Sequence, residues 1–194
     1  MNISSTFEAV SQPSLFTRLA DKALGDEILS GPETRSVLQC PDDELFSLLG
    51  AAFQVREHYF GRRVHLHLLM NAKSGLCPED CAYCSQSSVS SAPIEKYTLR
   101  SKDQILQDAH KAKEAKALRF CIVTSGRGPT RGEVGEMADV VREIKRSVDI
   151  EICCCMGLLD EDKASALKAA GVDRVNHNLN TSRSHHPEIC STHT

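Results

Sequence analysis

The sequence predicts an α/β fold in which helices cover a parallel β-sheet, and two observations support this prediction. Strand-like runs alternate with helical patterns from about residue 63 to residue 180. The first of these runs, residues 63–72, is rich in leucine, as is typical of a buried strand. Strands that alternate with helices form right-handed βαβ units. Both an open doubly wound sheet and a (β/α) TIM-type barrel fit this pattern.

The first 60 residues differ from the rest, and we expect them to form an N-terminal helical segment. Residues 1 to about 30 are rich in Ser and Thr and weakly patterned, so they should be frayed or loosely docked. An amphipathic helix should follow Pro41 and end near Gly61. Its apolar positions at helical spacing are Leu45, Leu48, Leu49, Ala52 and Phe53.

The α/β elements then follow in order. After the strand at residues 63–72 comes a cysteine-rich loop, and Ser101 with Gln104 forms a predicted capping box at the start of a helix. A second strand is predicted at residues 117–126. Polar loops at strand ends are where this fold class collects its functional residues.

The pattern repeats in the remaining chain. A helix is predicted around residues 134–144, a strand at 148–157, a helix at 160–170 closed by Gly171, and a fourth strand at 172–180. A complete eightfold barrel takes about 250 residues. Only 133 residues follow Gly61. We therefore expect residues 61–194 to be the first half of a barrel, truncated before its later strands.

Composition restricts the partners. The chain has 23 basic and 26 acidic residues, a net charge of −3, and no block of one sign. We therefore expect neither nucleic acid nor a membrane as partner, but a small molecule. No apolar run approaches the roughly 20 residues that span a bilayer, and the start lacks a signal peptide, so we expect a cytoplasmic protein. The nine clustered cysteines indicate metal or redox chemistry in a reducing compartment.

Three of these cysteines, Cys77, Cys81 and Cys84, have the spacing CxxxCxxC in one short loop. A structural zinc site needs four ligands. A [4Fe–4S] cluster held by three thiolates keeps one iron free for a small molecule, and we favour this interpretation. The alternative is a degenerate zinc site closed by a histidine such as His65 or His67.

With Tyr83 directly before the last cysteine, the motif resembles the signature of the radical S-adenosylmethionine (SAM) enzymes. The resemblance implies a (β/α) barrel of the radical SAM kind. It also implies that SAM chelates the free iron and is cleaved by an electron from the cluster. The products would be methionine and a 5′-deoxyadenosyl radical that abstracts hydrogen from a C–H bond.

From about Pro41 onward the resemblance narrows to the biotin synthase family. It is carried by the stretches AAFQVREHYFG, VHLHLLMNAKSGLCPEDCAYCSQSSVSSAPIEKY, RFCIVTSGRGP, GLLDEDKASALKAAGVDRVNHNLNTS and ICSTHT. The family inserts sulfur into dethiobiotin, forms homodimers, and takes electrons from a donor such as flavodoxin or ferredoxin. The sulfur comes from a [2Fe–2S] cluster whose third cysteine and arginine lie on later strands that this chain lacks. The activity is therefore expected of the intact protein, and the chain alone should be inactive.

Cys121 and Cys153 match the family's positions for ligands of the second cluster. Strand periodicity puts both on one face of their strands, and neighbouring strands lie about 4.8 Å apart, so the two thiolates can reach one iron. Cys154 should face the helices, and Cys155 has the right parity but no family position, so we expect both to pack. We assign Cys190 no cluster role.

Asparagines mark the end of the predicted fourth strand. Asn176 and Asn178 can each pair with both the N–H and C=O groups of a cyclic urea such as that of dethiobiotin. The resemblance places Asn178 beside substrate and the SAM ribose, and Asn180 near the ribose; Tyr83 is expected at the same cofactor. The alternative is that these asparagines only cap a turn. The stretch TSGRGPT, residues 124–130, would contact the methionyl end of SAM.

Two other functions remain open. One is a different radical SAM enzyme of the same branch, such as a maturase or a mutase, although the pair Cys121 and Cys153 argues against it. The other is an inactive iron–sulfur, metal-binding or interaction fragment. The remaining histidines show no spacing typical of a metal site, and we expect them in loops or in solvent. They are His110, His185, His186 and His193.

Overall fold

A computed structural model describes residues 13–193. The chain divides into two compact units, Met1–Val64 and His65–Thr194. The first twelve residues of the segment expected to be frayed lie outside the described residues. In the described part of the chain, no helix has both the length and the apolar character needed to cross a bilayer.

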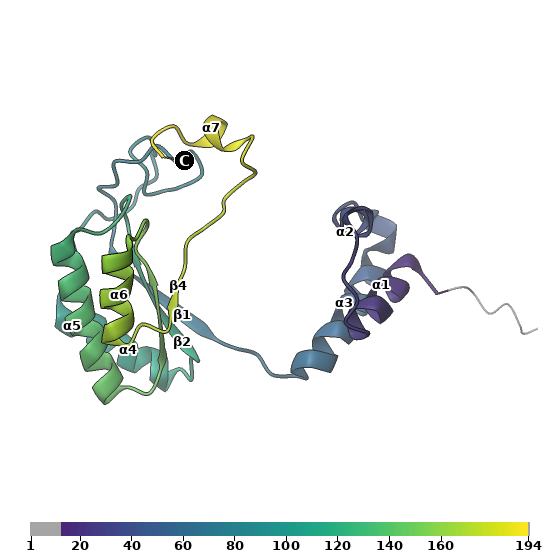
Figure 1. The fold of residues 1–194 in the computed structure, drawn as a ribbon, viewed down its shortest axis with the longest axis horizontal. Helices are drawn as coiled ribbons and strands as arrows, with labels where there is room; N and C mark the ends of the chain where they lie inside the picture. The colour runs from purple at the N-terminus through teal and green to yellow at the C-terminus, as the bar shows by residue number, and fades with distance from the viewer. Residues whose placement is uncertain (1–12, 194) are drawn as a thin grey trace, which may run out of the picture. The chain divides into compact units, whose positions relative to one another are not determined.

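The first unit is helical (Figure 1). It contains α1 (Leu15–Leu24), α2 (Gly31–Leu38), the short 3₁₀ helix η1 (Asp42–Glu44) and α3 (Leu45–Phe60). Ser14 caps α1, which buries Phe16 and Leu19 in a small core with Ala51 of α3. The expectation of a loosely docked segment is therefore wrong for α1, because its apolar residues share one helix face. The helix predicted to end near Gly61 is α3.

The second unit contains a four-stranded parallel sheet in the order β1-β2-β3-β4. Its strands are β1 (His67–Lys73), β2 (Arg119–Thr124), β3 (Glu151–Cys155) and β4 (Arg174–Val175). The crossovers are α4 (Lys102–Glu114), α5 (Arg131–Ser147) and α6 (Glu161–Ala170), and the short α7 (His186–Ile189) comes last. The alternation predicted from the sequence is confirmed.

All three crossover helices lie on the same side of the sheet (Figure 1). The side chains of Met70, Ile122, Ile152 and Cys154 pack with them in one core. The opposite face is open, and Leu69 on it is 66% exposed. Strands in sequence order with helices on one face form the wall of a (β/α) barrel, whereas a doubly wound sheet reverses its strand order and carries helices on both faces. The barrel alternative is therefore the correct one.

Local signals place most element ends. The predicted capping box is present, since Ser101 Oγ accepts from Gln104 N and the Gln104 side chain accepts from Ser101 N. Gly171 ends α6 with φ +104°. The fourth strand is shorter than predicted: it ends at Val175 and not at residue 180. As the edge strand, β4 has a partner on one side only, and its last link to β3 is the bond from Asn176 N to Cys154 O.

Asp173, just before β4, fastens three elements together. Its carboxylate accepts from the Lys145 Nζ at 2.6 Å and from the Ile152 amide at 2.7 Å. Burial alone would raise the pKa of Asp173, but these two bonds hold it below the ordinary value of 3.8. The unfolded chain therefore takes up this proton more readily than the folded one. The stabilisation is complete above the ordinary pKa and is lost as pH falls through the lower folded value.

We expect Asp173→Ala to lower the free energy of unfolding by about 1–2 kcal/mol at pH 7, because two hydrogen bonds to a charged group are lost. The difference from the parent should shrink as pH falls below about 4. Urea denaturation at pH 7 and pH 3 measures both. The matched control is Asp162→Ala, whose carboxylate is 84% exposed in a 3.5 Å pair with Arg131 and should change stability by less than about 0.5 kcal/mol.

Candidate functional site

A cavity of about 780 Å³ lies at the carboxyl ends of the strands in the second unit. Each strand contributes the segment that follows it. These are the cysteine loop after β1, residues 125–127 after β2, residues 157–158 after β3 and residues 177–181 after β4. Parallel strands direct these segments to one edge, which explains why one cavity collects them.

The cysteine loop turns sharply as it leaves β1. Gly75 and Leu76 both have positive φ, +62° and +56°. The turn is held by bonds from the Gly75 amide to Gln86 Oε1 at 2.9 Å and from Ser125 Oγ to the Gly75 carbonyl at 2.5 Å. A side chain at Gly75 would also meet Lys96 Cγ at 2.6 Å. Contacts within the protein therefore hold the shape of the loop.

Cys77, Cys81 and Cys84 all line this cavity as free thiols. Within residues 13–193, no set of three or more metal-binding side chains that includes Cys77 or Cys84 has its ligand atoms within 4.8 Å of one another. The three thiols therefore do not surround a single ion. Thiolates that each bind a different iron of one cluster are spread in this way around a shared space, so the donor set fits an iron–sulfur cluster.

The zinc alternative with a histidine from β1 is wrong. His67 is the first residue of β1, whereas the cysteine loop follows Lys73, the last residue of that strand. A strand rises about 3.3 Å per residue, so His67 and the loop lie about 20 Å apart. His65 precedes the strand at the same end. Neither imidazole can reach Cys77, Cys81 or Cys84.

Cys121 and Cys153 are direct partners in the register of β2 and β3. They lie on the open face of the sheet, opposite the helices. Burial raises the pKa of the Cys153 thiol, and the adjoining Cys121 thiol raises it further through charge and a hydrogen bond. Cys154 faces the helices and is fully buried, as expected. Cys155 lines the cavity, so the expectation that it only packs is wrong.

The asparagines after β4 have different positions. Asn178 and Asn180 line the cavity. Asn176 Nδ2 donates to Asn178 Oδ1 at 3.3 Å and lies 3.8 Å from Cys155 Sγ, so Asn176 links the Asn178 side chain to β3. Tyr83 also lines the cavity, and burial together with nearby Cys81 raises its pKa to about 12. Its phenol therefore stays neutral at physiological pH.

A second layer of contacts around the cysteine loop was not predicted. Glu79 and Asp80, between the first two cysteines, bind the end of the chain. The Glu79 carboxylate contacts His193 Nδ1 at 2.5 Å and accepts from Thr192 Oγ1 at 2.7 Å. The Asp80 carboxylate accepts from the Ser191 amide at 2.9 Å. His193 lies in a loop, as expected, but its imidazole contacts Glu79 and is only 20% exposed.

Comparison with known proteins decides the family. Residues 73–194 match the family model of the radical SAM superfamily. The chain belongs to the radical SAM superfamily. Membership implies a [4Fe–4S] cluster and SAM, which agrees with the three cavity thiols described above.

Among radical SAM relatives, the chain is 51% identical over 177 residues to biotin synthase of Lysinibacillus sphaericus, which covers 91% of this chain and 53% of that protein. It is 48% identical over 176 residues to biotin synthase of Bacillus subtilis strain 168, with 91% and 52% covered. The chain thus spans about half the length of the curated relatives it matches. The FeFe-hydrogenase maturase HydG from Carboxydothermus hydrogenoformans superimposes with a TM-score of 0.73 at 20% identity, covering 90% of this chain and 41% of HydG, which shows a shared fold.

Proposed function

We propose that the intact protein is a biotin synthase, a radical SAM sulfurtransferase that converts dethiobiotin to biotin in the last step of biotin biosynthesis. The single observation that carries the proposal is the register pair of Cys121 and Cys153 on the open face of the sheet. Two adjacent thiols facing the barrel interior give a second metal-binding position beside the cavity. The identity of about 50% to biotin synthases over most of the chain supports the same function.

The first cluster is assigned to the cysteine loop. In this proposal Cys77, Cys81 and Cys84 hold the [4Fe–4S] cluster. When bound, the cluster and SAM supply a 5′-deoxyadenosyl radical that abstracts hydrogen from substrate. The chain's own contribution is position: the fixed turn at Gly75 sets the course of the cysteine loop, whose thiols line the cavity.

The second cluster is assigned to the sheet. Cys121 and Cys153 would hold a [2Fe–2S] cluster together with a cysteine and an arginine from strands beyond this chain. Their position supports this role, because β2 and β3 align the two sulfurs without any backbone change. The thiols lie on the same face as Cys155, which lines the cavity, so sulfur held there is near the space where substrate binds.

Substrate and cofactor contacts are assigned to the cavity's polar residues. Asn178 and Asn180 would bind the SAM ribose, and Asn178 would also bind the ureido ring of dethiobiotin. Asn176 would meet substrate or, through its bond to Asn178, hold that amide in place. Tyr83, neutral beside the last cluster cysteine, would contact SAM.

We further propose the setting in which this chemistry takes place. Residues 61–194 would be the first half of the barrel, preceded by a helical segment at residues 1–60. The intact protein would act in the cytoplasm as a homodimer. It would take electrons from a donor such as flavodoxin or ferredoxin and have neither nucleic acid nor a membrane as partner.

The proposal is tested on the intact protein, reconstituted with iron and sulfide without oxygen. With dethiobiotin, SAM and a reductant we expect biotin and 5′-deoxyadenosine, measured by mass spectrometry. Iron analysis should show two clusters. Formation of 5′-deoxyadenosine without biotin would instead identify another radical SAM enzyme. Failure to bind iron when zinc is absent from the reconstitution would contradict both functions.

A further inference from the structure

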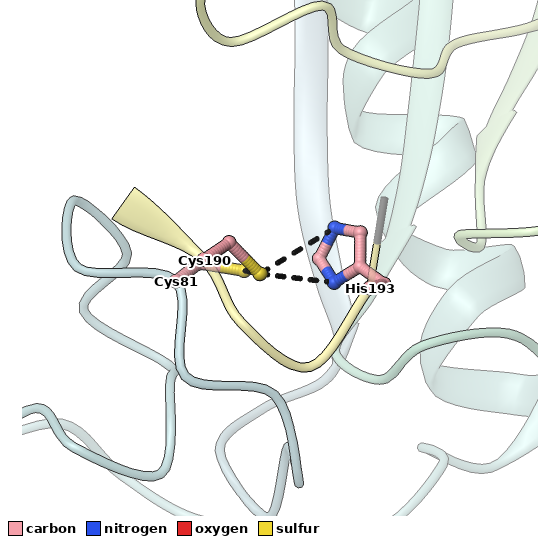
Figure 2. A group of neighbouring side chains, drawn as sticks. All are labelled: Cys81, Cys190 and His193. Atoms are coloured by element: carbon pink, nitrogen blue, oxygen red, sulfur yellow. Dashed lines mark hydrogen bonds between the residues drawn. The ribbon is translucent and has the colours of Figure 1, made fainter. Parts of the chain in front are cut away.

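Cys81, Cys190 and His193 form a compact group beside the cavity (Figure 2). The Cys81 and Cys190 sulfurs are 3.7 Å apart, and Cys190 Sγ lies 3.2 Å from His193 Nδ1 and 3.9 Å from Nε2. Across residues 13–193, it is the one set of three or more metal-binding side chains whose ligand atoms all lie within 4.8 Å of one another. We propose that these three side chains form a zinc site that shares Cys81 with the iron–sulfur ligand set, so that zinc and the cluster exclude each other.

The sulfur positions suit tetrahedral zinc. Zinc binds a thiolate at about 2.3 Å, so two sulfurs on one tetrahedral ion lie about 3.8 Å apart. The separation of 3.7 Å between the Cys81 and Cys190 sulfurs is close to this value. No such match exists for a single ion at Cys77 or Cys84, which belong to no group of this compactness among the described residues.

The histidine is held beside the two sulfurs by a buried carboxylate. Glu79 is 5% exposed, and its carboxylate contacts His193 Nδ1 at 2.5 Å. A carboxylate on one ring nitrogen leaves the other nitrogen as the ligand, an arrangement common around zinc. Cys190 Sγ lies nearer to Nδ1, at 3.2 Å, than to Nε2, at 3.9 Å, so the imidazole must reorient for Nε2 to face a zinc held by the two sulfurs.

Hydrogen bonds fasten the segment that carries Cys81 to the segment that carries Cys190 and His193. The Ala82 amide donates to the Ile189 carbonyl at 2.9 Å, and the Asp80 carboxylate accepts from the Ser191 amide at 2.9 Å. Cys190 is 4% exposed and Cys81 9% exposed. The two sulfurs therefore have the spacing of zinc ligands with the imidazole beside them, and the fourth position is left for water from the cavity that Cys81 and His193 line.

Zinc and the iron–sulfur cluster would exclude each other because both need the Cys81 sulfur. The zinc site itself depends only on the geometry above, whereas the exclusion also rests on the proposed cluster ligands. With zinc bound between Cys81 and Cys190, the cluster would keep only Cys77 and Cys84 as thiolate ligands. The cysteine loop would thus select between two metals according to supply, and zinc would hold the enzyme inactive.

The test uses the full 194-residue chain, purified without iron under reducing conditions and titrated with zinc against a chelator. Cobalt replaces zinc as a spectroscopic probe, since sulfur ligands give it a charge-transfer band. We expect Cys190→Ser and His193→Gln to weaken zinc binding by on the order of 100-fold and to reduce the cobalt band. Cys40→Ser, in the first unit, is the matched control and should bind zinc like the parent.

Iron reconstitution of three cysteine variants shows which residues the cluster and the zinc each need. Cys77→Ser should lose the cluster and keep zinc affinity, Cys190→Ser should keep the cluster and lose zinc, and Cys81→Ser should lose both. Circular dichroism checks that each variant is folded. Zinc affinity unchanged in both Cys190→Ser and His193→Gln would overturn the proposal, as would a Cys77→Ser variant that loses zinc as fully as Cys190→Ser.

Failure of this proposal is distinguishable from failure of the proposed function. The intact protein with Cys190→Ser should still form biotin, and zinc added before iron should inhibit the parent but not this variant. A protein that forms no biotin under any metal condition would contradict the proposed function but not the zinc site. Equal inhibition of parent and variant by zinc would overturn the exclusion.

Discussion

Replacing Cys77 or Cys84 by serine is expected to abolish cleavage of SAM in the intact protein. Each substitution leaves two thiolates in the loop for a cluster that needs three, and serine is a much poorer ligand for iron. The radical has no other source in this fold, so the acceleration that enzymes provide, ~10⁶-fold or more, should be lost almost entirely. Iron content, the visible absorbance of the cluster and the yield of 5′-deoxyadenosine measure the loss.

Two sets of variants show whether this effect is specific. Cys40→Ser, outside the second unit, should retain full iron and activity. Cys121→Ser and Cys153→Ser should keep SAM cleavage and the first cluster but lose the second cluster and biotin formation. SAM cleavage and biotin formation should separate in this way because Cys121 and Cys153 lie on the sheet face and not in the cysteine loop. A Cys77→Ser protein with unchanged iron content would refute the ligand assignment.

Much of the second unit is predictable because its signals are local. The capping box at Ser101, the glycine end at Gly171 and the apolar runs of β1 to β3 each depend on neighbours within a few residues. The strand order is different, since periodicity cannot say which strands pair. Only the structure shows that the order is sequential with helices on one face, which selects the barrel. The predicted length of β4 was wrong for a related reason, because an edge strand ends where its one partner stops providing hydrogen bonds.

Features of the site that depend on local sequence could also be predicted, whereas contacts between distant residues could not. The CxxxCxxC spacing predicts a cluster loop from eight residues of sequence, and strand parity predicts that Cys121 and Cys153 share a face. Contacts across more than 100 residues leave no such pattern, which is why the roles of Glu79 and Asp80 were missed. A weak signal did exist for the second metal-binding group: Cys190 and His193 have the spacing Cys-x-x-His, but their partner Cys81 lies 109 residues away.

Gly157→Ala is expected to destabilise the second unit and to disrupt the cavity at the same time. Gly157 has φ +76°, and a Cβ there would lie 2.4 Å from the Arg127 carbonyl oxygen. That oxygen is fixed, because it accepts from the Leu158 amide at 2.8 Å. A backbone clash cannot be relieved by a side-chain rotation, so the loops after β2 and β3 must separate. We expect a loss of about 2–3 kcal/mol in the free energy of unfolding.

A glycine in an open position gives the matched control. Gly135 in α5 has no heavy atom within 4 Å of an added Cβ, so Gly135→Ala should raise stability by up to about 1 kcal/mol through helix propensity. Urea denaturation compares the two variants, and SAM binding to the reconstituted intact protein should weaken only for Gly157→Ala, because Arg127, Gly157 and Leu158 line the cavity. If both variants proved equally stable and bound SAM equally well, close packing of these two loops would not shape the site.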